Sequence, residues 1–163
     1  MTPPKETRGA PRKFELSLAE TTVVGAATPL IDSHLQHLSR RFQSLGLTCD
    51  TQVKQTPRGL STFLAVMGQR GLLFLVDVTL ADGRLASGRP GAAIDVWLLD
   101  ACGEVIAPCT PTPAIGAARY QTLDELLANQ AKLSRSMTSV YVLALAHFGL
   151  LPTSDRGAQP LAP

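Results

Sequence analysis

The stretch from Leu60 to Ala107 constrains the fold most strongly, because it is the only long region of the chain with the apolar runs of β-strands. Three apolar runs of strand length are separated by turns that contain glycine, and a fourth, shorter run follows. This arrangement is typical of consecutive hairpins. Gly68 and Gly71 bracket a short connection, so the first two strands should pair antiparallel. The connection from Ala81 to Gly91 is longer, which predicts a wide loop or a mobile flap.

Two aspartates interrupt the apolar runs of this region. In the second strand both alternating sets of side chains are largely apolar, which predicts a central strand that is covered on both faces. Asp77 lies in that strand and Asp95 lies in the next one. A buried carboxylate without a partner is costly, so we expect each aspartate to have one.

The clearest helical pattern runs from Thr28 to Leu45. Thr28 suits the N-cap and Pro29 the first helical position, while Gly46 suits the left-handed position just past the end. The apolar residues of this segment repeat at intervals of four and three residues and form one stripe: Ile31, Leu35, Leu38, Phe42 and Leu45.

Two histidines, His34 and His37, lie with Arg41 along one flank of this stripe. Their spacing can place two imidazoles near one metal ion. No third ligand follows at a suggestive spacing, so we interpret the histidines as polar neighbours of the core and predict no metal site.

Two further segments have the alternation of strands. Phe14 to Val24 favours a strand near the N-terminus, and Leu47 to Thr56 is polar with a weak alternation that predicts an exposed or edge strand. A lysine on an edge strand discourages strand addition by a partner, and Lys54 should have this effect.

The second helical region covers residues 122–151. Thr122 and Glu125 have the spacing of a capping box. The segment from Ser134 to Ser139 consists of weak helix formers, so the region is either one helix or two with a break there. The segment from Val140 to Phe148 is apolar on all sides, which predicts burial against the sheet or against a second subunit. The candidate self-association residues are Val140, Leu143 and Phe148.

These patterns predict an α+β domain. Its antiparallel sheet should have four to six strands in a meander of hairpins, flanked by an N-terminal helix and a long or broken C-terminal helix. The length of 163 residues suits one domain, which we place at residues 14–151. We expect residues 1–13 to be a disordered basic arm, residues 108–120 a proline-rich linker, and residues 152–163 a disordered tail.

Charge, hydropathy and cysteine content narrow the class of protein. The formal net charge is only +2, so there is no global electrostatic argument for nucleic acid. No apolar run approaches the roughly 20 residues that span a bilayer, and the N-terminus lacks the apolar core of a signal peptide. We therefore predict a cytoplasmic protein without a membrane partner. Cys49, Cys102 and Cys109 are an odd and sparse set, which predicts reduced thiols and no disulfide scaffold.

The common catalytic and cofactor motifs are absent from the chain. It has no Gly-Lys-Ser phosphate loop, no G-x-G-x-x-G, no G-x-S-x-G and no Cys-x-x-Cys, and we expect no cofactor. Leu133 to Leu151 is similar in spacing to the recognition helix and following turn of winged-helix regulators, in which polar side chains meet base edges. Here Val140, Leu143 and Ala144 fall where polar groups are needed, which favours core or dimer packing instead.

The placement of two acidic residues gives a second resemblance to a known fold. Asp77 in a strand, the hairpin after it and Glu125 in the next helix resemble the opening of the ribonuclease H fold. The resemblance implies carboxylates around two metal ions, with Asp77 and Glu125 as two of them. Together with Asp95 of the next strand, they are the candidate catalytic residues of a metal-dependent phosphodiesterase. The later segment that should supply another aspartate, residues 139–145, contains none, so the carboxylate cluster is incomplete.

Four arginines on predicted turns are candidate anion-binding residues, because guanidinium groups suit phosphate and carboxylate. They are Arg58, Arg70, Arg84 and Arg89. Scattered solubilising charge is the favoured explanation of these arginines, and nucleic-acid binding by them together with the basic arm is the alternative.

The sequence thus predicts a small accessory or regulatory protein without chemistry of its own. It should act by binding a macromolecular partner, either another protein or a second copy of itself as a homodimer. A nucleic-acid-binding protein and a metal-dependent phosphodiesterase are the two alternatives.

Overall fold

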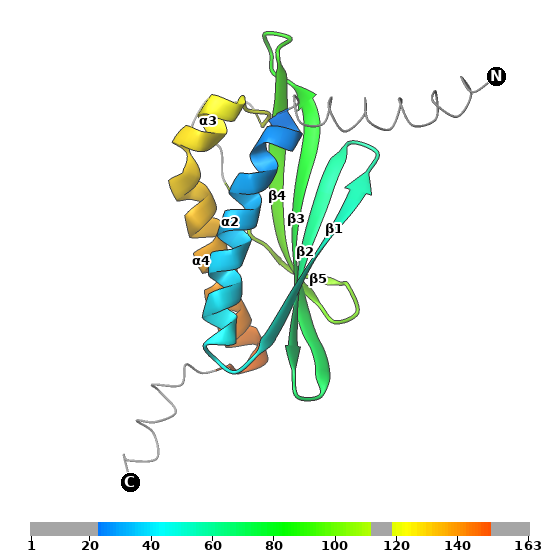
Figure 1. The fold of residues 1–163 in the computed structure, drawn as a ribbon, viewed down its shortest axis with the longest axis vertical. Coiled ribbons are helices and arrows are strands. Elements are labelled where there is room, and N and C mark those ends of the chain that lie inside the picture. The colour runs from blue at the N-terminus through cyan, green and yellow to red at the C-terminus, as the bar shows by residue number, and fades with distance from the viewer. Residues whose placement is uncertain (1–22, 112–118, 151–163) are drawn as a thin grey trace, which may run out of the picture.

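A five-stranded antiparallel sheet forms one layer of the molecule, and helices form the other (Figure 1). The computed structural model describes residues 23–111 and 119–150. The strands follow the order of the chain, β1-β2-β3-β4-β5, so the sheet is the predicted meander and the α+β class is confirmed. The strands are β1 (Thr48–Thr56), β2 (Gly59–Gly68), β3 (Gly71–Arg84), β4 (Pro90–Asp100) and β5 (Val105–Pro108). The predicted arm, most of the predicted first strand and the predicted tail lie outside the described residues.

Three helices complete the described part of the chain: α2 (Val23–Gln43), α3 (Leu123–Ala128) and α4 (Gln130–Phe148). The long helices α2 and α4 pack against each other and against the same face of the sheet (Figure 1). Phe42 of α2 contacts the rings of Phe74 in β3 and Tyr141 in α4, with centroids 5.2 and 5.3 Å apart, so it joins all three elements. None of the described helices is long and apolar enough to cross a membrane.

The N-terminal boundary of α2 differs from the prediction. The helix begins at Val23, so Thr28 is no N-cap and Pro29 lies inside the helix. The Thr28 hydroxyl instead donates to the carbonyl oxygen of Val24 at 3.0 Å. Val24 and Ala27 are buried and extend the apolar stripe upstream, and this packing offsets the donor that proline lacks. Gly46 has the predicted left-handed conformation, with φ of 86°.

The connection between β3 and β4 is shorter than predicted. The two strands pair as far as Arg84 and Pro90, so only residues 85–89 form the loop. Within the loop, the amide of Leu85 donates to the Arg89 carbonyl and the Arg84 guanidinium donates to the Gly88 carbonyl, at 2.9 and 2.8 Å. Proline at the first residue of a strand is compatible with the sheet, so Pro90 does not stop the pairing.

The break in the second helical region lies at Asn129, rather than between Ser134 and Ser139. The side-chain amide and the backbone amide of Asn129 both donate to the Glu125 carbonyl, at 2.8 and 3.0 Å, which ends α3. Ser136 and Met137 are buried in the core, and this packing overrides the weak helix propensity of their segment. The predicted capping box of Thr122 and Glu125 is confirmed.

Candidate functional site

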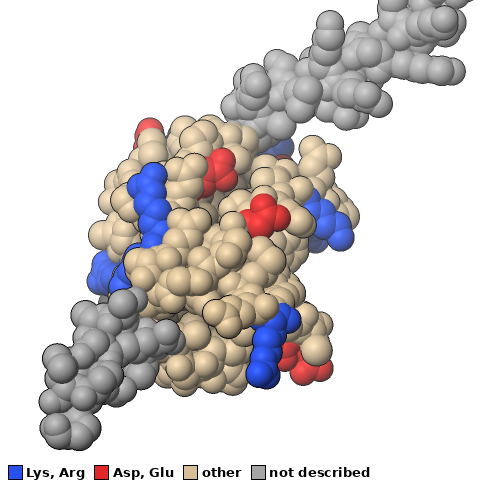
Figure 2. All heavy atoms as spheres, turned by 60° about the horizontal axis from the view of Figure 1, so that its bottom comes forward, with Lys and Arg blue, Asp and Glu red and all other residues tan. Residues whose placement is uncertain are grey.

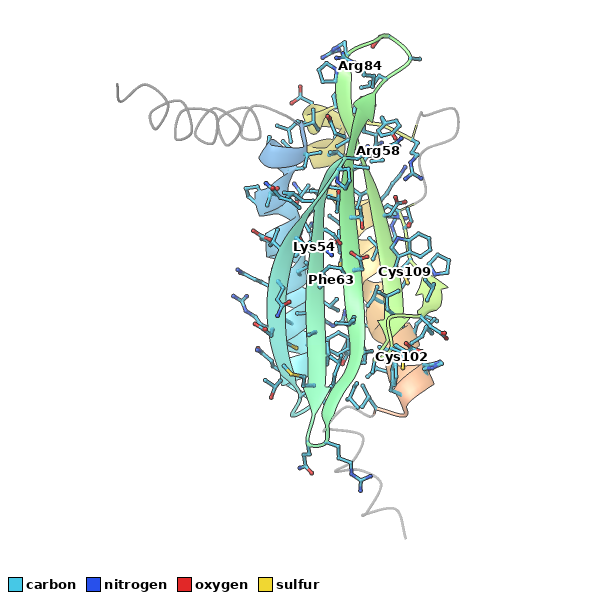
Figure 3. The ribbon with its side chains drawn as sticks, turned by 90° about the vertical axis from the view of Figure 1, so that its right-hand side faces the viewer. Lys54, Arg58, Phe63, Arg84, Cys102 and Cys109 are labelled. Atoms are coloured by element: carbon cyan, nitrogen blue, oxygen red, sulfur yellow. The ribbon has the colours of Figure 1, made fainter. Side chains whose placement is uncertain are left out.

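One face of the sheet carries no helix among the residues that the structure describes. In β3, the side chains of Phe74, Val76, Val78 and Leu80 point toward α2 and α4 and are buried. The alternate side chains of β3 point the other way and are half-buried. Figure 3 views the sheet from that side, which we call the open face, with the helices behind it. β3 is the central strand as predicted, but the prediction of cover on both faces was wrong, because both long helices pack on the same side.

An apolar band crosses the open face. The strand register places Phe63 of β2 opposite Asp77 of β3, and Asp77 opposite Trp97 of β4. In the next row, Leu75 of β3 is opposite Leu99 of β4. Leu75 and Leu99 are directly opposed, and Phe63 and Trp97 lie on either side of Asp77 in the neighbouring row, so these four side chains form an apolar band around Asp77. Phe63 and Trp97 are only partly buried.

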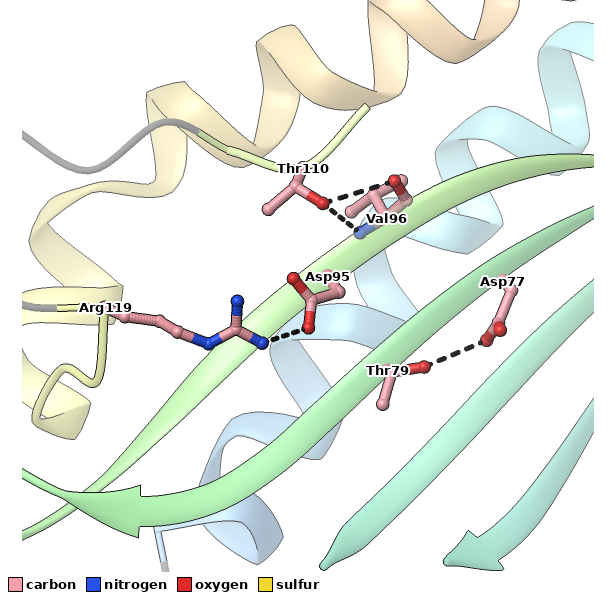
Figure 4. Close-up of polar contacts among 6 residues, drawn as sticks. All are labelled: Asp77, Thr79, Asp95, Val96, Thr110 and Arg119. Atoms are coloured by element: carbon pink, nitrogen blue, oxygen red, sulfur yellow. Dashed lines mark hydrogen bonds and ion pairs between the residues drawn. The ribbon is translucent and has the colours of Figure 1, made fainter. Parts of the chain in front are cut away.

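Asp77 has hydroxyl partners instead of a cation. Its carboxylate accepts a hydrogen bond from Ser61 at 2.6 Å. It accepts a second one from Thr79 at 3.3 Å (Figure 4). Within the described ranges, the only ion pair joins two other residues, so the negative charge of Asp77 has no cationic partner there. The predicted partners of Asp77 are therefore neutral donors, and the apolar band holds an uncompensated carboxylate.

Asp95 has the cationic partner that Asp77 lacks. It forms an ion pair with Arg119, which returns from the proline-rich linker (Figure 4). The next residue, Tyr120, lies with its ring against Gly83 of β3, where a Cβ atom would be 2.2 Å from the ring. These two side chains therefore lie over one end of the open face. Sequence reasoning missed both, because nothing in a linker indicates which strand it will cross.

The three candidate catalytic carboxylates do not gather at one place. Asp77 and Asp95 are both on the open face, whereas the Glu125 carboxylate accepts hydrogen bonds from the Thr122 amide and hydroxyl at 3.1 Å. Across residues 23–111 and 119–150, no three His, Cys, Asp or Glu side chains are grouped so that they could hold a metal ion.

The four candidate anion-binding arginines divide between the two ends of the sheet. Arg58 and Arg84 lie at one end (Figure 3), where the Arg58 carbonyl accepts from the Asp82 amide at 2.7 Å, and the loop with Arg89 adjoins them. Arg70 is in the β2–β3 turn at the other end. Figure 2 shows cationic side chains spread over the surface that it views, without a single basic patch.

The candidate self-association residues of α4 have different environments. Val140 is fully buried in the core of its own chain. Phe148 stacks on Phe74 with ring centroids 4.8 Å apart, and Leu143 keeps 38% of its surface exposed. Val142 is 54% exposed, so the segment is covered on one side only, although its sequence is apolar all round.

Two further polar features lie among the helices: a cavity that contains two histidines, and a buried lysine. A cavity between α2 and α4 is lined by both histidines and by Arg41, whose guanidinium stacks 3.8 Å from the centre of the Tyr141 ring. Burial lowers the pKa of His34 below its ordinary value, against the opposing effect of a hydrogen bond with Gln130. On the other side of α4, the Nζ atom of Lys132 is buried and has no hydrogen-bond partner in the described part of the chain.

None of the three cysteines forms a disulfide among the described residues: Cys109 is buried, Cys49 is half-buried and Cys102 is exposed in the β4–β5 turn. Comparison with protein-family models, with curated proteins and with solved structures finds no match to this chain.

Proposed function

We propose that this chain is a non-enzymatic accessory or regulatory protein, that it acts as a homodimer, and that a protein partner docks on the open face. The observation that supports the docking surface is the apolar band, in which Phe63, Leu75 and Trp97 are only partly buried and which has no helix over it in the described residues. Aromatic side chains are enriched in protein–protein interfaces, and two of the band's members, Phe63 and Trp97, are aromatic.

The charge in the band specifies the chemistry of the partner. Asp77 lies between Phe63 and Trp97, accepts hydrogen bonds from two hydroxyl groups and forms no ion pair within the described residues. A partner that covers the band must either desolvate this carboxylate or supply a cation, and the first option is costly. We therefore propose that the partner is an amphipathic helix whose apolar side carries one lysine or arginine. This helix would pack on the open face as α2 and α4 pack on the opposite face of the sheet.

The single tryptophan of the chain, Trp97, provides a direct assay. Its fluorescence should shift to shorter wavelength when a designed amphipathic helical peptide with a central lysine covers the band. The same peptide with glutamate in place of the lysine is the matched control and should bind more weakly. Asp77→Asn should weaken binding of the lysine peptide by about tenfold, because a charge-assisted hydrogen bond is lost.

Two further variants separate the face from the rest of the surface. Phe63→Ala should also weaken binding of the lysine peptide, whereas Leu127→Ser, which changes an exposed leucine on α3, should leave it unchanged. Equal binding of the two peptides, or no loss in Asp77→Asn, would contradict the proposed partner. A shift that depends on protein concentration and needs no peptide would assign the face to a second copy.

The alternative functions have less support. A nucleic-acid interface would have to use arginines that are divided between two ends of the sheet, and the Arg84 guanidinium already donates to a carbonyl of its own loop. A phosphodiesterase site would have to bring Glu125 out of its capping box. A cytoplasmic location accompanies the proposal as a prediction, since reduced thiols suit that compartment.

A further inference from the structure

The two edges of the sheet are protected to very different degrees. β5 has four residues and ends in proline, which is a common way to prevent another strand from pairing. β1 has nine residues, contains neither glycine nor proline, and is exposed along most of its length. Val53 at its centre is 55% exposed. An edge of this kind offers a row of backbone donors and acceptors to another chain.

The register of the β1–β2 hairpin determines which backbone groups of β1 are free. Thr56 and Gly59 close the two-residue turn, and no bulge interrupts the pairing from there to Thr48. Hydrogen-bonded and non-hydrogen-bonded pairs alternate along an antiparallel pair of strands, beginning with a hydrogen-bonded pair at such a turn. The N–H and C=O groups of Thr51 and Val53 therefore point away from β2, toward solvent.

Opposite charges lie at matching distances from the centre of β1. Gln52 is the central residue, with Asp50 two positions before it and Lys54 two positions after it. All three side chains point to the open face, since they share the parity of Phe63 through the β1–β2 register. Asp50 has one weak contact, to the Gln52 amide at 3.5 Å, and no ion pair of Lys54 occurs within the described ranges.

We infer that two copies of this chain pair through β1, antiparallel, about a two-fold axis at Gln52. In this register each Asp50 lies directly opposite Lys54 of the second copy, and Thr48 lies opposite Thr56, so all nine residues overlap. The outward backbone groups of Thr51 then meet those of Val53 in the second copy. The charged pairs occupy non-hydrogen-bonded positions, where side chains approach most closely.

Lys54 discourages the addition of a foreign strand to β1, but it favours the symmetric pairing of two β1 strands. A foreign strand leaves Lys54 opposite an arbitrary residue, whereas the symmetric register supplies a carboxylate to each lysine. Moving the axis to Thr51 or Val53 shortens the overlap and places Gln52 opposite Asp50 or Lys54, so both ion pairs are lost. The symmetric register is therefore favoured over its neighbours.

The pairing also arranges the proposed docking surfaces. Directly opposed residues project from the same face of a sheet, so the open faces of the two copies lie side by side on one continuous sheet. The inference deepens the homodimer in the proposed function by assigning it to β1. It is independent of peptide binding, because it needs neither Asp77 nor Trp97.

A charge exchange tests the assignment. Light scattering during size exclusion should give the wild-type chain a mass of twice 17.3 kDa. Asp50→Lys and Lys54→Glu should each be monomeric, because like charges then face each other twice. The double variant Asp50→Lys/Lys54→Glu should be a dimer again, and an equimolar mixture of the two single variants should form a heterodimer. Arg70→Glu, a charge reversal at the β2–β3 turn, is the matched control and should remain dimeric.

Single cysteine substitutions in β1 test the pairing register of the two β1 strands directly. Gln52→Cys in a Cys102→Ser background should cross-link to a disulfide dimer under mild oxidation, because its Cα atom faces its own copy at roughly 4.5 Å. Asp50→Cys in the same background faces Lys54 and should give only background cross-linking.

The outcomes separate this inference from the broader proposal. A dimer that survives both charge reversals but dissociates on Leu143→Glu would overturn the β1 assignment and leave the homodimer in place through α4. A monomeric wild-type chain would overturn the β1 pairing and the homodimer together, while the peptide assay on Trp97 would still decide whether the open face binds a partner.

Discussion

Single polar side chains in apolar surroundings give this protein most of its specific features. Asp77 and Asp95 occupy similar positions on adjacent strands, yet one carboxylate is held by hydroxyl groups and the other by Arg119. The sequence predicts that both need partners, because an isolated buried charge is costly. It does not predict which partner each one finds, since Arg119 arrives from a segment 24 residues further along the chain.

Lys132 should lower the stability of the fold. Its Nζ atom is buried without a hydrogen-bond partner in the described residues, and burial of an ammonium group without a partner is destabilising. Lys132→Met keeps the unbranched side chain and removes the charge, so it should raise the free energy of unfolding by about 1 kcal/mol in chemical denaturation. Arg135→Met, an exposed change one turn away, should have little effect. A destabilised Lys132→Met would mean that the ammonium has a stabilising ligand.

His34 should make stability depend on pH. Burial is the largest cause of its lowered pKa, followed by a hydrogen bond with Gln130 that acts in the opposite direction and by the nearby charge of His37. The unfolded chain therefore binds this proton at a higher pH than the folded chain. The free energy of unfolding should fall as pH drops below the ordinary value of 6.5, and this loss should end below the folded pKa.

Two substitutions in α2 test whether the titration of His34 causes this pH dependence. His34→Gln should remove much of the loss of stability between neutral and mildly acidic pH, measured by urea denaturation at each pH. His37→Gln should keep most of it, because burial of His34 is the main cause. An unchanged pH profile in His34→Gln would assign the dependence to another group.

Elements were predicted best where their own residues specify them. The glycine turn between β2 and β3, the capping box of α3 and the αL residue that follows α2, Gly46 with φ of 86°, all depend on local geometry. The errors are at boundaries that packing decides. α2 continues through Pro29 because Val24 and Ala27 are buried, and α4 continues through its serine-rich segment because Met137 is buried.

Gly83 should be required at its position because the Tyr120 ring packs directly against it. A Cβ atom at this position would lie 2.2 Å from the Tyr120 ring, so Gly83→Ala must displace the ring and should cost about 1–3 kcal/mol of stability in thermal or urea unfolding. Gly83→Ala/Tyr120→Ser removes the ring and should recover part of the loss. If the double variant is no more stable than the single one, contact with the ring is not the reason for the glycine.

At the scale of the whole molecule, the arrangement of layers determines what surfaces are available. Both long helices cover one side of the sheet, and the open face with its apolar band is the consequence. The meander order also makes β1 an edge strand over its full length, which is why the pairing of two copies can be tested there.

The sequence by itself determined the apolar runs of the sheet, the glycine turn between β2 and β3, the apolar stripe of α2 and the α+β class, because each depends on residues that are close along the chain. Only the tertiary structure decided which side of the sheet the helices cover, since the apolar content of β3 suits cover on either face. It also decided that Phe63, Asp77 and Trp97 form one row and that Arg119 meets Asp95. These contacts join distant parts of the chain, and their register follows from how the strands pair in space, which no local pattern specifies.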